Sequence, residues 1–526
     1  MPARPERLAL LERPERLAVK FLIEMVGRKL DHYPTSRKAT MRRLLAFAKH
    51  LFPANSARGR FVRRLVPGWV SPARRGYRHY IMRTEPGLWR LPLHDDRTEP
   101  LFSVVIPMFN TPERYLAPLA DSLINQSYPH FEAILADAST DAARAASIER
   151  RADLDERLRY VRLPSNGGIS ANTNAALAVA QAPYVVFVDH DDILAPGALN
   201  EVACELADDP GIDMFYSDED LLTEDGLRRK SPSFKPDWSP HMLLHCNYTN
   251  HLSVMRRSIV EEVGGLRPEF DGAQDYDLLL RVHSLGRVLN VCHVPLVLYH
   301  WREAVASTAH KIGNKGYAIE AGRRALVEYL RRVGVAGEVG GFAADPSWHC
   351  VKPRWAVDVA VICAGEASSG IDELRAGVGR TICRPVWLAQ VGDVDLTAVP
   401  AGVAAVVVVR QPFQPDDSGW LDDLVGVLSL PQAVVVAPLL IGADGPLDVE
   451  ALDAGNPNVA SMRATDGIGD ASFTWPVGMV RDASSVLPTV VAVKRSDMDL
   501  LANPGHRVEV TPDRGFAVVW GPQRMH

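Results

Sequence analysis

The stretch Tyr184–Leu194 reads Y-V-V-F-V-D-H-D-D-I-L, and it decides the fold of the chain around it. Its first five residues form a compact apolar run with β-branched and aromatic members, which is typical of a strand buried on both faces. Three carboxylates, Asp189, Asp191 and Asp192, follow at once. Ligands bind at the carboxyl ends of strands in open α/β sheets, so we expect this acidic cluster to lie at a ligand site.

The acidic cluster has two interpretations. Carboxylates packed this closely repel one another, and a hard divalent cation such as Mg²⁺ or Mn²⁺, which prefers oxygen ligands, would compensate them. The alternative is a solvated turn between a strand and a helix, with Asp192 as the helix N-cap. Acidic turns are common, so the cluster by itself leaves both interpretations open.

Strand and helix patterns alternate before this stretch. Apolar runs predict strands at 102–107, 131–136 and 159–163, and helical patterns predict helices at 113–126 and 171–182. This alternation is typical of an α/β fold with a parallel sheet and right-handed crossover connections. Each predicted strand ends in polar or glycine-containing residues. We therefore expect a ligand site along the edge where these strand ends meet.

The chain after Leu194 continues this domain and then begins another. Strands are predicted at 213–218, 252–255, 288–291 and 295–299, and helices at 275–285 and 317–333. A boundary is predicted at 348–355, followed by strand-like runs at 356–364, 404–409 and 433–437 and a helix at 420–428. The predicted organisation is a basic helical region (1–100), an α/β domain (101–345) and a smaller α/β domain (350–526).

The composition is that of an ordinary globular protein. The 526 residues carry a formal net charge of −6, and 47% of them are hydrophobic; this length suits two to four domains. No run of about 18 apolar residues is free of charge, so no transmembrane helix is expected. Charged residues between Arg4 and Arg13 interrupt any signal-peptide core. The six cysteines lie far apart, which favours reduced thiols and a cytoplasmic location.

Two basic amphipathic helices are predicted in the first hundred residues, at Leu17–Val26 and Met41–Phe52. Such helices either lie on an anionic membrane surface or pack on the next domain with a solvated basic face. The first interpretation predicts a peripheral location at the inner face of the plasma membrane. Nucleic acid is not an expected partner, because no recognisable nucleic-acid-binding module accompanies the charge.

Six short motifs, in order along residues 101–310, resemble those of family 2 glycosyltransferases with the GT-A fold. They are 104–110 (VVIPMFN), 132–141 (EAILADASTD), 166–174 (NGGISANTN), 189–191 (DHD), 274–275 (QD) and 299–302 (YHWR). The stretches 216–220 (YSDED), 234–238 (FKPDW) and 247–248 (NY) resemble a subgroup that builds bacterial surface polysaccharide, including rhamnosyltransferase-like O-antigen enzymes. Each motif alone is weak, and the order of all six carries the resemblance.

This resemblance implies a Rossmann-like GT-A domain that binds a nucleotide sugar. It implies a metal-dependent, inverting transfer of a hexosyl or deoxyhexosyl group from a nucleotide-diphosphate donor to a hydroxyl. The acceptor would be a saccharide or a lipid-linked saccharide of the bacterial cell envelope. The implied cofactor is a divalent cation, Mn²⁺ or Mg²⁺, held by Asp189, Asp191 and His300, which would stabilise the negative charge that grows on the leaving diphosphate.

Asp275 is the general base that the resemblance implies. The acceptor hydroxyl is a poor nucleophile, and a carboxylate can take its proton. A purely structural role is also open, since an acidic residue at the start of a helix interacts favourably with the helix dipole. Gln274 departs from the Glu-Asp pair that is usual in the family, which removes a carboxylate and would alter contacts with the acceptor.

The resemblance also assigns binding roles to two sets of residues. The nucleotide-sugar set is Pro107, Phe109, Asn110, Asp137, Asn166, Gly168, Asn172, Asp189, His190, Lys235 and Arg302. The acceptor-side set is Asp218, Asn247, Gln274 and Trp301. Ala138 replaces a second Asp that is usual in the family, while Asp137, which would recognise the base, is retained. Lys235 and Arg302 would pair with the diphosphate, although each could equally be a surface charge.

The second α/β domain is similar to the middle of another GT-A domain. Its stretches 407–412, 419–424 and 434–445 carry this resemblance. Arg410-Gln411-Pro412 stands where the acidic motif should be, and an Arg there leaves no metal ligand. Our hypothesis is a degenerate, inactive copy that serves assembly or acceptor binding.

Two other functions compete with sugar transfer. A hydrolase of nucleotide sugars or phosphodiesters could use the same acidic cluster with a positioned water. A non-catalytic scaffold of a polysaccharide assembly complex is the third hypothesis, and retention of both the acidic motif and Asp275 argues against it.

Overall fold

A computed structural model gives the structure of the protein. It describes residues 77–303, 315–341, 348–364, 367, 371–378, 381–390, 394–410, 413–414, 419–442, 445–446, 481–483, 485–486, 490–501, 508–509 and 516–525. The helices predicted at Leu17–Val26 and Met41–Phe52 lie outside these residues. No helix in the described part of the chain is long and apolar enough to cross a membrane.

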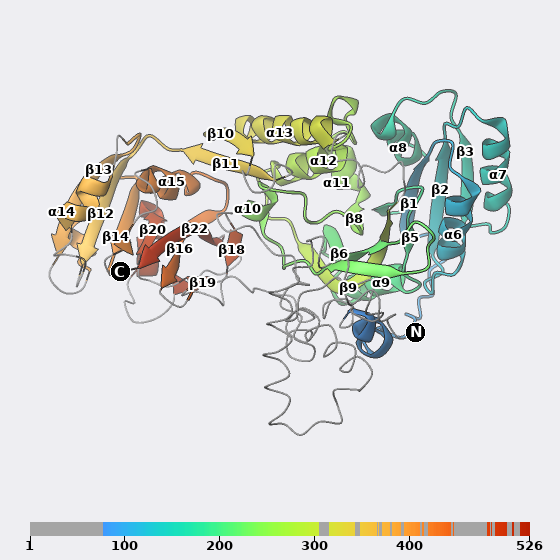
Figure 1. Ribbon diagram of the computed structural model, residues 1–526, viewed down its shortest axis with the longest axis horizontal. Helices are drawn as coiled ribbons and strands as arrows, with labels where there is room; N and C mark the ends of the chain where they lie inside the picture. The colour runs from blue at the N-terminus through green and yellow to red at the C-terminus, as the bar shows by residue number, and fades with distance from the viewer. Residues whose placement is uncertain are drawn as a thin grey trace, which may run out of the picture. The chain divides into compact units, whose positions relative to one another are not determined.

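Four parallel strands form one half of the first sheet (Figure 1). They are β1 (Phe102–Met108), β2 (Phe131–Asp137), β3 (Leu158–Arg162) and β4 (Tyr184–Phe187), in the order β3-β2-β1-β4. In this register Val104 lies opposite Ala133 on one side and Val186 on the other. The predicted parallel arrangement is confirmed for these strands, and their carboxyl ends meet at one edge.

The other half of the sheet is mixed. After β4 the order continues through β8 (Ser253–Arg256), β6 (Met214–Leu222), β9 (Val291–Arg302) and β5 (Ile193–Leu194), with β7 (Arg229–Ser233) paired to β6. β8 runs antiparallel to β4 and β6, whereas β6 and β9 are parallel. The run predicted at 295–299 lies within strand β9, whereas of the run predicted at 288–291 only Val291 belongs to that strand. The fold is therefore a mixed α/β sheet of the Rossmann-like GT-A type.

Side chains that alternate along the strands explain why the sheet is covered on both faces. Val104 and Val186 belong to one buried cluster, and Val105 and Val185 belong to another that also contains Ala176 of a covering helix. The elements around the sheet are α6 (Glu113–Ile124), α7 (Ala142–Ala152), α8 (Ile169–Leu177), α9 (Ala198–Asp208), α10 (Pro240–Leu243), α11 (Arg257–Glu262), α12 (Gln274–His283), α13 (Lys315–Arg332), the π-helix η2 (Tyr80–Thr84) and the 3₁₀ helices η3 (Glu85–Gly87) and η4 (Pro268–Phe270). The sequence pattern missed α7, which begins at the N-cap Asp141.

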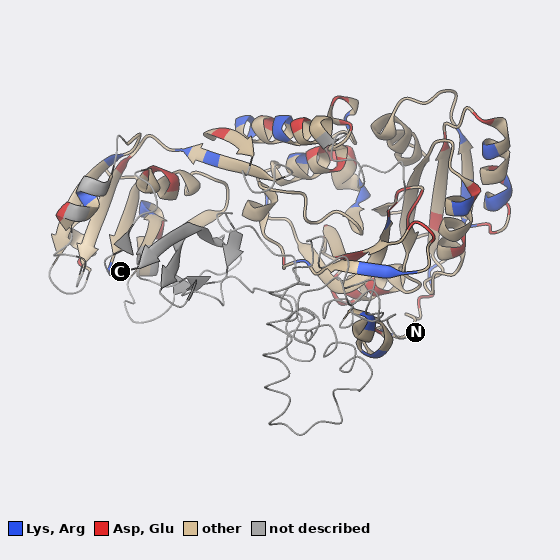
Figure 2. Ribbon diagram, viewed as in Figure 1, with Lys and Arg blue, Asp and Glu red and all other residues tan. Residues whose placement is uncertain are grey.

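The charged helices α7 and α13 carry many of the basic residues of this part of the chain (Figure 2). On α13, Arg323 pairs with Glu320 at 2.6 Å and Arg332 pairs with Glu328 at 2.8 Å. Such exposed pairs contribute little to stability, because water and salt screen the charges. We therefore interpret these basic residues as part of solvated helix faces and not as a binding patch.

A second set of strands follows α13. The ribbon of β10 (Ala336–Gly341) and β11 (His349–Arg354) occupies the predicted boundary. A second sheet has the order β13-β12-β14-β20-β16-β22-β15. Its elements and their neighbours are β12 (Asp358–Ala364), α14 (Ile371–Gly377), β13 (Arg384–Gln390), a turn at Leu396–Ala398, β14 (Ala405–Val409), β15 (Phe413–Gln414), α15 (Trp420–Val427), β16 (Ala433–Gly442), β17 (Gly445–Pro446), β18 (Arg481–Ala483), β19 (Ser485–Val486), β20 (Val490–Lys494), a turn at Arg495–Leu501, β21 (Val508–Glu509) and β22 (Phe516–Met525). That this region is a degenerate copy stays a prediction, as do the domain boundaries.

Candidate active site

The acidic turn after β4 is held by strand β9. The Tyr299 hydroxyl donates to Asp192 Oδ2 at 2.6 Å and accepts from the Asp189 backbone N–H at 3.2 Å. The Arg302 backbone N–H donates to Asp192 Oδ1 at 2.7 Å. Asp192 is fully buried and is followed by β5, while the next helix, α9, has Gly197 at its N-cap. The interpretation of Asp192 as a solvated helix cap is therefore wrong, because the carboxylate fastens the turn to β9.

The carboxylates of this turn lie close enough together to shift one another's pKa values. Burial, with the nearby charges of Asp191 and Asp275, raises the pKa of Asp189 to about 7. Burial, with the charges of Asp191 and Asp189, also raises the pKa of Asp192 well above its usual value. Positive charge at this turn would relieve the repulsion, which is the condition that a cation site meets.

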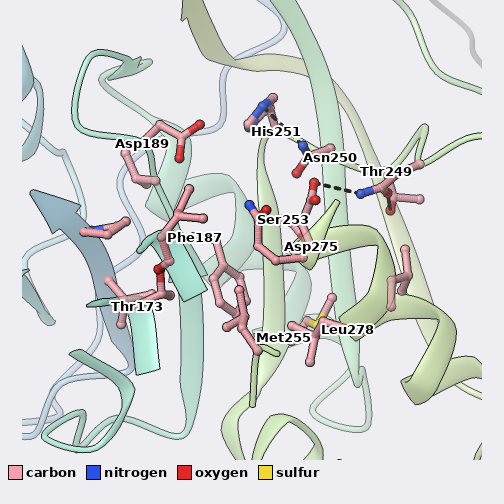
Figure 3. A pocket seen from close by; sticks show the side chains of 18 residues that line it. Thr173, Phe187, Asp189, Thr249, Asn250, His251, Ser253, Met255, Asp275 and Leu278 are labelled. Atoms are coloured by element: carbon pink, nitrogen blue, oxygen red, sulfur yellow. Dashed lines mark hydrogen bonds between the residues drawn. The ribbon is translucent and has the colours of Figure 1, made fainter. Parts of the chain in front are cut away.

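A pocket joins the acidic turn to helix α12 (Figure 3). Its apolar floor is Val105, Pro107, Ile169, Phe187, Val188, Met255, Leu266, Leu278 and Leu279, and its polar lining is Asp189, Thr173, Asn247, Thr249, Asn250, His251, Ser253, Gln274 and Asp275. Asp189 comes from the end of β4, and Asp275 comes from the first turn of α12. Two carboxylates that lie far apart in the sequence thus line one pocket at the edge where the parallel strands end.

Asp275 is placed by α12 and by one amide. Asn247 Nδ2 donates to Asp275 Oδ2 at 3.0 Å, and Thr249 Oγ1 donates to Asn247 Oδ1 at 3.2 Å. Burial raises the pKa of Asp275 above its ordinary value, although hydrogen bonds from the helix backbone and from Asn247 oppose the shift. Gln274 also lines the pocket, and its Oε1 accepts from the Gly272 backbone N–H at 2.8 Å.

The three predicted metal ligands are only partly assembled. Pairing of β5 with β9 sets Ile193 opposite His300, so the acidic turn and His300 lie on neighbouring strands. The His300 Nδ1, however, is 2.7 Å from Asp220 Oδ1. Within the described residues, no three His, Cys, Asp or Glu side chains are grouped as a metal site. The oxygen donors and raised pKa of the acidic turn fit a hard cation, and the ligand set stays a prediction.

Two of the residues predicted to bind the nucleotide sugar, Asp137 and Asn110, form hydrogen bonds with other parts of the protein. Asp137 is fully buried; it accepts from the Ser139 backbone N–H at 2.8 Å and from the Tyr160 hydroxyl at 3.0 Å. Asn110 Oδ1 accepts from the backbone N–H groups of Thr140 and Asp141 at 3.1 and 3.0 Å. Phe109, in contrast, exposes 40% of its surface at the end of β1. These contacts shape the ends of β1 and β2, with Phe109 as the accessible apolar face.

The loop before α8 is closed by its own amides. Asn166 Oδ1 accepts from the Gly168 backbone N–H at 3.1 Å and from Asn172 Nδ2 at 2.9 Å. Gly168 has a φ of +93°, and a Cβ there would lie 2.6 Å from Asp271 Oδ2. Only glycine suits such a backbone conformation this close to a neighbour.

Lys235 and Asp218 lie in a buried network rather than in the lining of the pocket. Lys235 Nζ donates to the carbonyl oxygens of Asn250 and His251, the latter at 2.6 Å. Asp218 Oδ1 accepts from the Lys235 backbone N–H at 2.8 Å and lies 3.0 Å from His293 Nε2. Lys235 thereby supports the loop that lines the pocket, and Asp218 holds the backbone of Lys235.

Arg302, His190 and Trp301 surround the acidic turn. Arg302 Nε donates to the Asp191 carbonyl oxygen at 2.7 Å, and its guanidinium lies 5.4 Å from the centre of the Tyr115 ring. One Arg302 terminal nitrogen and His190 Nδ1 are buried without a hydrogen-bond partner among the described residues. Trp301 packs against His251, with 5.6 Å between the ring centres.

Sequence reasoning missed the segment Thr249–Asn250–His251, which supplies a continuous part of the polar lining. The motif assigned at 247–248 ends just before it, and its residues show no strand or helix period. The signal available was their position directly before the predicted strand at 252–255.

Comparisons with known proteins agree with the family resemblance that the sequence motifs predict. Residues 103–264 match the family described as glycosyl transferase family 2. An uncharacterised protein, y4gI, of Sinorhizobium fredii is 41% identical over 234 residues, which are 44% of this chain and 26% of that protein. The O-antigen biosynthesis protein RfbC of Myxococcus xanthus is 38% identical over 241 residues, 46% of this chain and 19% of that protein. The chain thus spans about a quarter or less of the length of these relatives.

Among solved structures, residues 1–349 of TarS from S. aureus match with a TM-score of 0.35 and 20% identity, over 44% of this chain and 65% of that one. The family match covers β1 to α11, the segment that supplies the acidic turn and the loop before α8. The predicted resemblance to family 2 glycosyltransferases is confirmed for residues 103–264, which match the model of that family.

Proposed function

We propose that this chain is a glycosyltransferase that moves a sugar from a nucleotide-diphosphate donor to a hydroxyl group of a saccharide or lipid-linked saccharide. Its product would belong to a bacterial cell-envelope or surface polysaccharide. The observation that carries the proposal is the single pocket lined by Asp189 and Asp275 at the carboxyl edge of β1 and β4. The O-antigen biosynthesis relative supports the polysaccharide context.

Asp275 would act as the general base. The acceptor oxygen forms a bond to the anomeric carbon, and the bond from that carbon to the diphosphate oxygen breaks. The diphosphate leaves with the electron pair, and the hydroxyl proton passes to Asp275. Burial makes this carboxylate a stronger base, and the Asn247 amide fixes its orientation. A single displacement of this kind inverts the anomeric centre.

Asp189 and Asp191 would hold a divalent cation, with His300 as the third protein ligand. When bound, Mn²⁺ or Mg²⁺ would neutralise the charge that develops on the leaving diphosphate. Arg302 would add positive charge on the same side, since its buried terminal nitrogen has no hydrogen-bond partner in the described part of the chain. Phe109 would offer its exposed ring to the nucleotide base.

The decisive experiment is an assay of nucleoside diphosphate release by the full chain. Sugar nucleotides of uridine, thymidine and guanosine are supplied with and without saccharide acceptors, and with and without Mn²⁺ or Mg²⁺. We expect release that requires both acceptor and cation. Equal release without acceptor would instead identify a hydrolase, and absence of both donor binding and release would identify a scaffold.

A peripheral membrane location is a separate proposal, which rests on the basic amphipathic patterns at 17–26 and 41–52. We expect the full chain to sediment with vesicles that contain anionic phosphatidylglycerol, and to be released by about 0.5 M salt, because salt screens surface charges. Equal binding to neutral phosphatidylcholine vesicles, or none to either, would contradict this location.

A further inference from the structure

Three consecutive residues between α10 and β8 form an uncharged wall of the pocket. Thr249, Asn250 and His251 line it together with Asp189 and Asp275 (Figure 3). Asn250 Nδ2 lies 3.3 Å from His251 Nε2, so the two side chains are joined at their polar ends. Hydroxyl, amide and imidazole groups can each both donate and accept hydrogen bonds, as sugar hydroxyls do.

The His251 ring is fixed in place and is neutral. It stacks on Tyr299 with 4.6 Å between ring centres and 19° between the planes, and Trp301 packs beside it. Burial, with the nearby charge of Lys235, lowers the pKa of His251 to about 3. At physiological pH the imidazole therefore carries no charge, and because its Nε2 accepts from Asn250 Nδ2, its Nδ1–H is the donor that remains for a sugar hydroxyl.

Lys235 determines the course of the backbone at this wall. Its side chain is 1% exposed, and its ammonium group donates to the carbonyl oxygens of Asn250 and His251. Glu219 lies 3.8 Å from the ammonium nitrogen and offsets its charge. His251 has a φ of +52°, a left-handed conformation that non-glycine residues adopt only at some cost. Two charge-assisted hydrogen bonds from one buried cation hold the backbone in that conformation.

The charge of the pocket limits the sugar that it can accept. Asp189 and Asp275 contribute carboxylates, and no Lys or Arg is found among the described residues that line the pocket. With Asp189 assigned to the cation, a sugar that carries a carboxylate would still face the Asp275 carboxylate without a counter-charge from a Lys or Arg side chain of this lining. A neutral sugar would instead present hydroxyl groups that match the wall of Thr249, Asn250 and His251. Unpaired and like charges are a strong source of discrimination between ligands.

We propose that Thr249–Asn250–His251 recognises the hydroxyl groups of an uncharged donor sugar, and that Lys235 is the positioning residue that holds this segment in its binding conformation. This inference rests on the proposed function, because the sugar is that of the nucleotide-sugar donor. It adds the class of sugar and the residues that select it.

The first test compares matched donors. UDP-glucose and UDP-glucuronate differ only at C6, where a hydroxymethyl group becomes a carboxylate, and GDP-mannose and GDP-mannuronate form a second such pair. dTDP-rhamnose completes the panel. With the full chain and Mn²⁺, calorimetry and transfer assays should favour neutral donors over uronates by at least about tenfold. A uronate that is bound and transferred as well as its neutral partner would overturn this inference alone. Failure of every donor to bind would overturn the proposed function, and this inference with it.

The second test removes the hydrogen bonds of the wall. His251→Phe keeps a ring for stacking on Tyr299 and removes both nitrogens. For the donor selected above, we expect binding about tenfold weaker, while the affinity for its nucleoside diphosphate alone is unchanged. Unchanged donor affinity, or an equal loss of affinity for the nucleoside diphosphate, would refute the role of His251 in sugar recognition.

The third test addresses Lys235. Lys235→Met removes the ammonium group, so we expect KM for the donor to rise and the preference for neutral sugars over uronates to fall, each about tenfold. Lys230→Met is the matched control, because Lys230 pairs with Glu303 at a partly exposed site. The sugar preference is the diagnostic readout, since a general loss of stability would not change it. A folded Lys235→Met protein with unchanged preference would refute the positioning role, and His251→Phe tests the wall if that protein does not fold.

Discussion

Hydrogen bonds and burial act in opposite directions on the pKa of Asp275. Its place in the first turn of α12 gives it backbone hydrogen bonds, and the Asn247 amide contacts its Oδ2 at 3.0 Å. Both stabilise the charged carboxylate, whereas burial acts in the opposite direction and prevails, so that the pKa is raised. A carboxylate with a raised pKa is a better proton acceptor than an ordinary Asp.

We expect Asp275→Asn to reduce the rate of transfer by roughly 10²–10⁴-fold, because the amide cannot accept the hydroxyl proton. Donor binding, measured by calorimetry, should remain close to that of the wild type. Asp153→Asn, at an exposed position after α7, is the control for a change of charge alone. An unchanged rate of transfer in the Asp275→Asn protein would exclude Asp275 as the base.

Replacement of Asn247 should shift the pH dependence of kcat/KM for transfer. The base must be deprotonated, so kcat/KM falls as the pH falls through the raised pKa of Asp275. The Asn247 hydrogen bond lowers that pKa, and its removal in Asn247→Ala should therefore move the acid limb of the profile to higher pH. The measurement is kcat/KM between pH 4 and 9. An acid limb that stays in place or moves to lower pH would show that Asn247 does not act through Asp275.

At the scale of elements, the loop between β3 and α8 is set by one glycine. Gly168 is the N-cap of α8 and combines a φ of +93° with close approach of Asp271. Gly264 has a similar φ of +84° but no atom within 4 Å of the position that a Cβ would occupy. A comparison of the two glycines therefore distinguishes the free-energy cost of backbone strain from that of steric contact.

Gly168→Ala should destabilise the protein by more than Gly264→Ala. Backbone strain alone costs on the order of 1–3 kcal/mol at such a position, and only residue 168 adds the clash with Asp271. Denaturant unfolding of both variants gives the comparison. Donor affinity should fall only in Gly168→Ala, since this loop is predicted to contact the nucleotide. An equal decrease in the free energy of unfolding in both variants would show that the Asp271 side chain moves aside without a loss of stability.

A pair of buried histidines joins α10 to β11. His245 Nδ1 lies 2.7 Å from the His349 carbonyl oxygen, and the His349 backbone N–H donates to the His245 carbonyl oxygen at 2.8 Å. Burial lowers the pKa of each imidazole to about 4. Between pH 6.5 and 4 the unfolded chain therefore binds protons that the folded chain does not, and stability falls as the pH falls.

The free energy of unfolding should thus decrease by up to about 1.4 kcal/mol per pH unit for each of these histidines between pH 6.5 and 4. His245→Asn should remove one of the two contributions and flatten the dependence between pH 7 and 5. His293 works in the other direction, because hydrogen bonds to Asp218 and Asp237 raise its pKa. An identical slope in His245→Asn and wild type, measured by urea unfolding, would contradict the assignment.

At the scale of the whole molecule, the acidic turn follows strand β4 of the first sheet and Asp275 lies on the neighbouring helix α12. The second sheet presents a different residue after its strand β14. Arg410 follows β14, whose five residues are fully buried, and supplies no carboxylate there. The hypothesis of a degenerate copy predicts that the second sheet does not turn over donors.

We therefore expect the full-length double variant Asp191→Ala/Asp275→Asn to lose all turnover of donors, both transfer and hydrolysis. The measurement is nucleoside diphosphate release over the same donor panel. Residual activity that is lost only when residues of 350–526 are changed would show that the second sheet is catalytic.

Several elements follow from sequence patterns because their cause is local. Apolar runs with β-branched residues predicted β1, β2, β3 and β4 within one or two residues, and helical periodicity predicted α13. The short strand β5 was not predictable, because its two residues are a strand only through pairing with β9. Lys235 has no local signal either: its role depends on carbonyl groups of residues 250 and 251 that folding brings to its ammonium group.

The sequence alone determined the parallel half of the first sheet and the acidic turn at its edge, because hydrophobic periodicity and a run of carboxylates are properties of neighbouring residues. It also indicated the resemblance to family 2 glycosyltransferases, through motifs in a fixed order. The tertiary structure decided that Asp275 faces the same pocket as Asp189, that Asp192 is a buried anchor, and that His300 pairs with Asp220. These outcomes depend on burial and on contacts between distant strands, which shift pKa values and occupy hydrogen-bonding groups in ways that no local pattern specifies.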